Sequence, residues 1–164
     1  MRIGIGCDQH GYDMKEAIKQ FLSGSNVDVT DYGCYDKSEI DYPDVAFAVA
    51  DRIRQGELDR GILICGTGIG VAIAAGKVPG IRAALCHDTY SAERAQKSNN
   101  AQILTMGAKV IGLEAAKKVV GAWLASSFEG GNSARKIDKI MEQEKRYLGR
   151  GGHEEADQRP GCGC

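Results

Sequence analysis

The feature that most constrains the fold is a regular alternation between short apolar runs and amphipathic helical segments. The apolar runs, such as RIGIGC and GILIC, have the length and the Ile-rich composition of buried strands. Between them, apolar residues recur at helical spacing, as in Val45, Val49 and Ile53. Strands separated by helices of this size form βαβ units. The sequence therefore predicts an α/β fold, a Rossmann-like open parallel sheet of about five strands sandwiched between helices.

The individual elements follow from the same pattern. We expect strands over 2–7, 27–32, 61–65, 81–86 and 102–105, and a short extended piece over 109–111. Helices are expected over 12–22, from Pro43 to about 54, in a short stretch ending near 75, and over 90–97, 113–126 and 133–148. Residues 1–148 are predicted to form one domain. The polar, Gly-rich tail over 149–164 is expected to be disordered.

Composition excludes several classes of partner. The 164 residues include 21 basic and 22 acidic side chains, so the formal charge is −1, and no basic excess points to nucleic acid. No apolar run approaches the roughly 20 residues that a membrane span needs. The first strand meets Asp8 too early for a signal peptide, so we expect a cytoplasmic protein without a membrane partner.

The six cysteines do not have the spacing of a zinc site or a disulfide framework. No C-x-x-C pair occurs, and Cys7, Cys65 and Cys86 each end an apolar run. Cys162 and Cys164 lie in the Gly-rich tail without a partner pair. We therefore expect buried thiols and a loose tail, with no metal.

The strand GILIC runs straight into the glycine-rich loop Cys65-Gly66-Thr67-Gly68-Ile69-Gly70. In an open parallel sheet, ligands bind at the carboxyl ends of the strands, where this loop would lie. Glycines there let backbone N–H groups close on an anion, helped by the positive end of the next helix. The same field favours a thiolate, so Cys65 could act as a base and the loop N–H groups could stabilise an enediolate oxygen. The alternative is an inert strand thiol.

A dinucleotide fold also begins with glycines after a strand. Gly66 and Gly68 fit that pattern, and Asp88 lies about 20 residues further on, at the end of the next strand. Against this, the third glycine comes one residue early and the helix before Lys77 has only about two turns. An NAD-dependent oxidoreductase therefore remains an alternative.

Longer motifs surround the loop. They are CGTGIGVAIAAGKVPGIRAAL, SAERAQKSNNAQILTMGAKVIGLEAAKKVV, the N-terminal GCDQHGYDMKE, the triplet Asp41-Tyr42-Pro43 and the turn Phe128-Glu129-Gly130-Gly131. Together, over residues 1–147, they resemble ribose-5-phosphate isomerase type B, a family that includes the galactose-6-phosphate isomerase subunits. The resemblance implies an aldose–ketose isomerase without cofactor or metal. It also implies a homodimer, or a dimer of dimers, with active sites shared between subunits.

The resemblance also implies roles for individual residues. Cys65 moves a proton between C1 and C2 through a cis-enediol, and Thr67 assists proton transfer at the oxygens. Gly66, Gly68, Ile69 and Gly70 bind the oxyanion through their backbone. The substrate-contacting positions are Asp8, Tyr42 and Asn99, with His10 one place later than the family histidine, because Gln9 takes that position.

Several further residues depart from the family pattern. The Asn of the family's A-A-N-K is Gly76, and the histidine that opens the sugar ring is Ser98. The phosphate-binding set becomes Lys109, expected from the partner subunit, with Asn132, Arg135 and Lys136. A lysine is a point charge and does not reproduce the bidentate fork of an arginine.

Ser98 bears on the substrate, because serine is a poor acid–base catalyst for ring opening. A four-carbon sugar phosphorylated at O4 cannot close a five-membered ring and needs no such catalyst. We therefore expect a tetrulose 4-phosphate, or another acyclic or shorter substrate, in preference to ribose 5-phosphate. Two alternatives stay open. His10 or His87 could open the ring from a shifted position, although a solvent-exposed His87 is the simpler interpretation. The altered site could also belong to a binding module that has lost catalysis.

Overall fold

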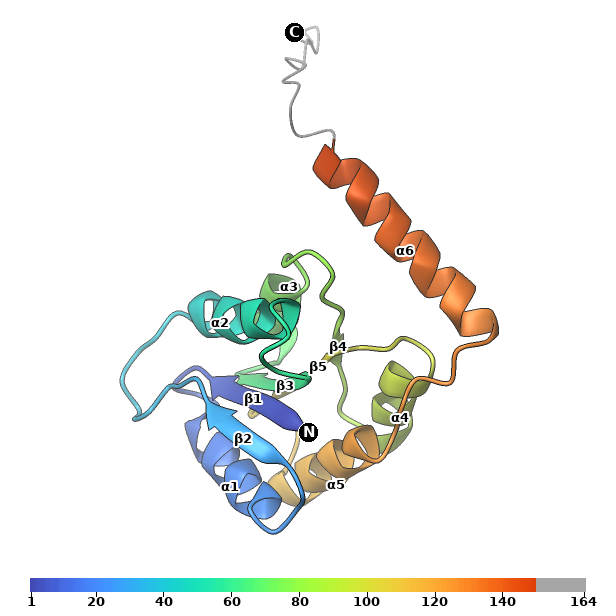
Figure 1. Cartoon of the computed structure of the whole chain (residues 1–164). Helices are drawn as coiled ribbons and strands as arrows, with labels where there is room; N and C mark the ends of the chain where they lie inside the picture. Colours follow the sequence, from blue (N-terminus) through green and yellow to red (C-terminus); the bar gives the residue numbers. More distant parts are fainter. Residues whose placement is uncertain (150–164) are drawn as a thin grey trace, which may run out of the picture.

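The computed structural model describes residues 1–149 (Figure 1). In chain order, its elements are β1 (Arg2–Cys7), α1 (Tyr12–Leu22), β2 (Asp28–Asp31), α2 (Tyr42–Arg54), β3 (Arg60–Cys65), α3 (Ile69–Ala75), β4 (Ala83–Leu85), α4 (Thr89–Lys97), β5 (Ile103–Gly107), α5 (Leu113–Leu124) and α6 (Asn132–Gly149).

The five strands form one parallel sheet in the order β2-β1-β3-β5-β4. The chain leaves β1 for β2 on one side and returns to β3 on the other, so the order reverses between β1 and β3. The register pairs Cys7 with Ile64 and Cys65 with Gly107. This architecture confirms the predicted α/β class. It also places the ends of β1 and β3 beside a crevice of the kind that binds ligands in such sheets.

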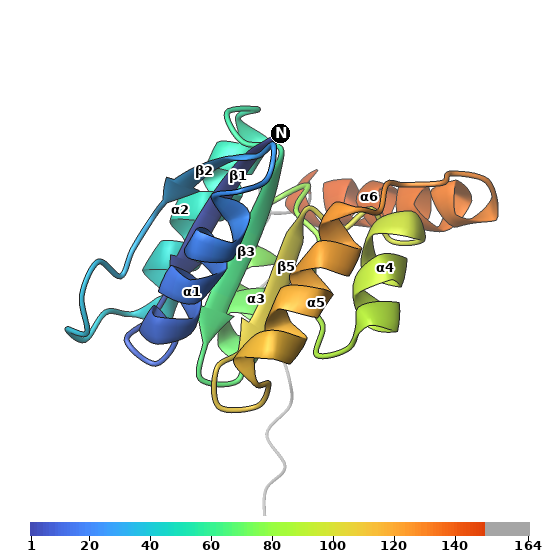
Figure 2. The same ribbon diagram turned by 90° about the horizontal axis from the view of Figure 1, so that it is seen from below.

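Helices cover both faces of the sheet (Figure 2). On one face, α1, α4 and α5 bury a cluster that contains Ile5, Ile62 and the fully buried Trp123. On the other face, α2 and α3 pack against Leu63 and Cys65. The central strands read as continuous apolar runs because both of their faces are buried.

Lys15 on α1 is fully buried and its Nζ lies 2.6 Å from Asp31 Oδ2, at the end of β2. Lys19 contacts the same carboxylate. Burial disfavours the charged form of Lys15, but hydrogen bonds to Asp31 and Glu16 outweigh it and raise the pKa of the ammonium group. The cluster therefore ties α1 to β2 through charged groups.

Three expected strand segments differ from the structure by more than one residue at an end. The strand expected over 81–86 covers only Ala83–Leu85, because the N–H of Ile81 still closes a turn onto Val78. The strand expected over 102–105 begins one residue later and extends to Gly107, which pairs with β3. The extended piece expected over 109–111 was wrong, because the N–H groups of Val110 and Ile111 both donate to the Gly107 carbonyl and form a turn.

The C-terminal helix α6 leaves the body of the fold and extends through Gly149 (Figure 1). The predicted tail thus begins inside a helix, and its other residues, 150–164, lie outside the described part of the chain. Within residues 1–149, no helix combines the length and apolar character needed to cross a membrane.

Candidate active site

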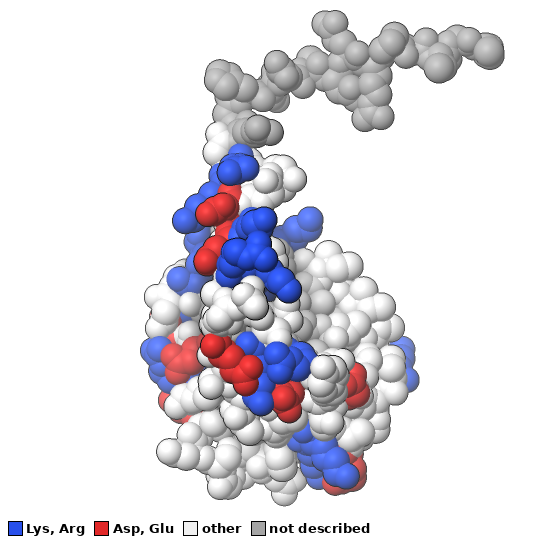
Figure 3. All heavy atoms as spheres, turned by 90° about the vertical axis from the view of Figure 1, so that its right-hand side faces the viewer, with Lys and Arg blue, Asp and Glu red and all other residues white. Residues whose placement is uncertain are grey.

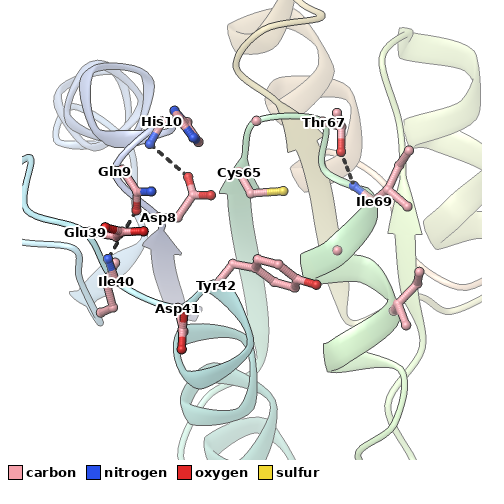
Figure 4. Close-up of a pocket in the computed structure, with 13 residues that line it drawn as sticks. Asp8, Gln9, His10, Glu39, Ile40, Asp41, Tyr42, Cys65, Thr67 and Ile69 are labelled. Atoms are coloured by element: carbon pink, nitrogen blue, oxygen red, sulfur yellow. Dashed lines mark hydrogen bonds between the residues drawn. The ribbon is translucent and has the colours of Figure 1, made fainter.

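A cavity of about 570 Å³ opens at the carboxyl edge of the sheet, where the strand order reverses. Three segments line it, as Figure 4 shows. They are the residues after β1 (Asp8, Gln9, His10), the approach to α2 (Glu39, Ile40, Asp41, Tyr42), and the end of β3 with the start of α3 (Cys65, Gly66, Thr67, Ile69, Gly70, Ile73).

Cys65 is the last residue of β3, and its Sγ points toward the glycine loop (Figure 4). The side chain is nearly buried, with 5% of its surface exposed. The N–H of Gly68 donates to Sγ at 3.1 Å. This hydrogen bond holds the sulfur against the loop, beside the cavity that Cys65 lines. Gly68 itself is buried behind the cavity and does not line it.

The other two strand-end cysteines have a different environment. Burial raises the pKa of the Cys7 thiol, as does its hydrogen bond with Cys34, whose sulfur is 3.6 Å away. Burial, together with the charge of Asp88, raises the pKa of Cys86 to about 11. Neither thiol lines the cavity. Both are buried, as the sequence predicted.

The loop after Cys65 is held by tight backbone contacts. Gly68 has φ +77°, and a Cβ there would lie 2.6 Å from Leu85 Cδ1 and from the carbonyl carbon of Met106. The N–H groups of Ala108 and Lys109 donate to the carbonyls of Cys65 and Gly66, at 2.9 and 3.0 Å. The loop conformation therefore requires glycine at position 68 and support from the turn after β5.

Asp8 lies across the cavity from the loop. It is 6% exposed, and its Oδ1 accepts the N–H groups of His10 and Gly11 at 3.0 and 3.2 Å. These bonds fix the carboxylate after β1, while the His10 side chain is exposed at the cavity. A Cβ built on Gly66 would lie 3.8 Å from His10 Cδ2 and 3.7 Å from Lys109 Cδ. Lys109, expected from a partner subunit, thus lies beside the loop of its own chain.

Tyr42 begins α2, and its ring packs on Gly70, where a Cβ would lie 2.6 Å from the ring carbons. The segment before it is tied to the end of β1, because Gln9 Oε1 accepts the N–H of Ile40 at 3.2 Å. Sequence reasoning missed Gln9, Glu39, Ile40, Asp41 and Ile73 as lining residues. Gln9 could have been found from its place between Asp8 and His10, and Asp41 from its triplet.

Four predicted residues lie away from this cavity: Asn99, Asn132, Arg135 and Lys136. Asn99 follows α4 and lines a second cavity with Arg82 and Ile140. The segment before α6 is fixed to the end of α4, because the N–H of Glu129 donates to the Lys97 carbonyl and the two side chains form an ion pair at 3.6 Å. Figure 3 shows Lys and Arg side chains along α6, with Asp and Glu side chains among them. We call Ser98, Asn99, Asn132, Arg135 and Lys136 the α4–α6 group.

His87 and Asp88 both have structural partners. The N–H of Gly107 donates to His87 Nε2 at 2.9 Å, so this half-buried side chain is not the exposed loop histidine that we expected. Asp88 caps α4 by accepting the N–H of Ser91 at 2.7 Å. In a dinucleotide site this acid would face a ribose instead. Among residues 1–149, no three His, Cys, Asp or Glu side chains are arranged to hold a metal ion.

Comparison with known proteins gives a consistent result. Residues 3–140 match the profile of the ribose/galactose isomerase family. The D-erythrulose-4-phosphate isomerase of Pectobacterium atrosepticum is 54% identical over 142 residues, covering 85% of this chain and 93% of its own. The Ribose-5-P isomerase B of Listeria innocua is 49% identical over 146 residues, with coverages of 89% and 99%. A solved ribose-5-phosphate isomerase B from Clostridium thermocellum, 47% identical, has a TM-score of 0.88, covering 90% of this chain and 99% of its own. The chain therefore belongs to the ribose/galactose isomerase family.

Proposed function

We propose that this sugar-phosphate aldose–ketose isomerase uses Cys65 as its proton-transferring base. One observation carries the proposal. The Cys65 sulfur lies between the cavity and the glycine loop, and accepts the Gly68 N–H at 3.1 Å. A thiolate there would meet a substrate carbon while backbone N–H groups meet its oxygens.

The reaction proceeds on the open-chain sugar. The Cys65 thiolate removes a proton from the carbon next to the carbonyl, and the C–H electrons form the double bond of a cis-enediolate. N–H groups of the loop stabilise the negative oxygen. The Thr67 hydroxyl relays a proton between O1 and O2, and the Cys65 thiol returns its proton to the neighbouring carbon. Asp8 and Tyr42 hold substrate hydroxyl groups.

The phosphate requires positive charge, which the cavity supplies at one side only. Asp8, Glu39 and Asp41 line the side formed by the loops after β1 and before α2, whereas Lys109 lies beside Gly66. We propose that a second copy of the chain brings its α4–α6 group to this cavity and completes the phosphate site. Ile69 and Ile73 on α3, beside the cavity, are 50% and 60% exposed, and the second copy would cover them. The assembly would be a homodimer or a dimer of dimers.

For the substrate, we propose a tetrulose 4-phosphate, such as erythrulose 4-phosphate. Ser98 Oγ accepts two hydrogen bonds from the Arg94 guanidinium. Neither a hydroxyl nor a guanidinium is suited to the acid–base catalysis that ring opening needs. The relative from Pectobacterium atrosepticum bears the name of a D-erythrulose-4-phosphate isomerase. Because carrying a phosphate's charge across a bilayer is costly, we infer that enzyme and substrate share the cytoplasm.

Parallel assays of erythrulose 4-phosphate, ribose 5-phosphate, allose 6-phosphate and galactose 6-phosphate test the proposal. We expect the highest kcat/KM with the four-carbon substrate, exchange of its C–H hydrogen with heavy water, and loss of both in Cys65→Ala. Binding of sugar phosphates with neither turnover nor exchange in the wild type would refute the catalytic proposal. Faster turnover of ribose 5-phosphate would refute only the substrate.

Subunit complementation tests the shared site. Cys65→Ala and the double variant Arg135→Ala/Lys136→Ala should each be inactive, or nearly so. If sites are shared in dimers, random reassociation of equal amounts restores one intact site in half of the dimers, about a quarter of wild-type activity. No recovery after confirmed subunit exchange would show that each chain forms its own site.

A further inference from the structure

We propose that His87 is a positioning residue, which holds the catalytic loop in place through the backbone of Gly107. The inference rests on the proposed function, in which the Cys65 loop carries the chemistry. His87 lies outside the cavity and does not touch the substrate site. Its imidazole Nε2 accepts the Gly107 N–H at 2.9 Å, and this bond connects the end of β4 to the end of β5.

Gly107 in turn lies against the loop. It pairs with Cys65 in the parallel register, and a Cβ there would lie 2.6 Å from the carbonyl carbon and oxygen of Thr67. The next two residues, Ala108 and Lys109, donate their N–H groups to the Cys65 and Gly66 carbonyls. A shift of Gly107 is therefore transmitted to three consecutive residues of the loop, from Cys65 to Thr67.

The imidazole replaces a backbone acceptor that β4 does not supply. Along β5, the N–H of Ile103 donates across to the Arg82 carbonyl, and alternate N–H groups of a strand face the same neighbour. The β4–β5 pairing ends at Leu85 and Thr105, after which the chain turns into α4, where Asp88 serves as N-cap. The Gly107 N–H thus faces β4 just beyond its end, where the side chain of His87 meets it.

The bond also sets the tautomer of His87. A ring nitrogen that accepts a hydrogen bond carries no hydrogen, so the proton of the neutral imidazole lies on Nδ1. An amide oxygen can accept the same N–H, whereas an aliphatic side chain cannot. Comparing His87→Gln with His87→Leu therefore separates the effect of the hydrogen-bond acceptor from the effect of side-chain size.

The test measures kcat and KM for the substrate that the wild type turns over fastest, with thermal unfolding of every variant. We expect His87→Leu to lower kcat about tenfold with KM changed less than about twofold, since the loop acts on the transition state. His87→Gln should recover kcat to within about threefold of the wild type. Asp88→Ala is the control, because it removes the α4 cap on the same turn. It should lower the unfolding temperature and leave kcat within about twofold.

The outcomes separate the possible failures. Unchanged kcat in His87→Leu, or a His87→Gln variant as slow as His87→Leu, would overturn the role of the acceptor. A kcat loss in Asp88→Ala equal to that in His87→Leu would show a general effect of destabilising the turn. If the wild type neither interconverted aldose and ketose nor exchanged substrate hydrogen with heavy water, the proposed function would fail and the inference with it.

Discussion

Replacing Gly107 with alanine should damage both catalysis and the stability of the fold. The new Cβ would lie 2.6 Å from the carbonyl carbon and oxygen of Thr67, whereas ordinary contact begins at 3.4 Å. Thr67 must therefore move by about 0.8 Å, because backbone atoms cannot rotate away as a flexible side chain can. Overpacking of this kind costs about 1–3 kcal/mol of stability. A displacement near 1 Å at reacting groups can cost about 100-fold in rate, so we expect kcat to fall about 10- to 100-fold.

The assay combines steady-state kinetics with urea denaturation of Gly107→Ala. Gly121→Ala is the matched control, because Gly121 lies inside α5 and a Cβ there meets no atom within 4 Å. It should keep wild-type kcat and raise stability by about 0.5–1 kcal/mol, since glycine is a poor helix former. If Gly107→Ala retained wild-type kcat, the loop would not depend on its contact with β5.

Two further predictions concern charge and thiol chemistry. Burial disfavours ionisation of Asp31, but hydrogen bonds from Lys15 and Lys19 outweigh this effect and lower the pKa of its carboxyl group. The stability that the ionised carboxylate contributes is therefore complete above the unfolded-state pKa of about 3.9, and it is lost as pH falls through the folded-state pKa. We expect Asp31→Asn to lose about 1–2 kcal/mol of stability at pH 7 in urea titrations, and the difference from the wild type to narrow as pH falls below about 4. A difference that stayed constant with pH would contradict the assignment. With a pKa of about 11, only about one in a thousand Cys86 thiols is ionised at pH 8. Iodoacetamide should therefore label Cys65 before Cys86 in peptide maps of the folded protein, and the reverse order would be inconsistent with Cys65 as the base.

The sequence predicted the sheet because its central strands are buried on both faces and read as plain apolar runs. It was less accurate at the edge, where β4 keeps only three residues. It was wrong at 109–111, since β-branched residues such as Val110 favour strands by propensity but here follow a glycine that ends the ladder. Hydrogen bonding by Gly107 decides that boundary, and residue type alone does not reveal it.

The site, too, was predicted from the sequence only in part. Cys65, Thr67, Asp8 and Tyr42 line one cavity because parallel strands bring their carboxyl ends to one edge. The sequence could not show that Lys109 lies beside its own loop, because this depends on a turn that the periodicity missed. Gln9 and Ile40 meet across a long connection, and neither residue type signals such a contact.

The turn after β5 also determines how the proposed catalytic loop would act on charge. The N–H groups of Ala108 and Lys109 in this turn donate to the carbonyls of Cys65 and Gly66. The peptide groups of the loop are thereby oriented, with their positive ends available to the substrate. Such a field comes from neutral dipoles that bind or release no protons and need no reorganisation during the reaction. Oxyanion stabilisation by this loop should therefore stay constant across the pH range in which the protein is folded, so that pH dependence of turnover reports on titrating side chains and on the substrate phosphate.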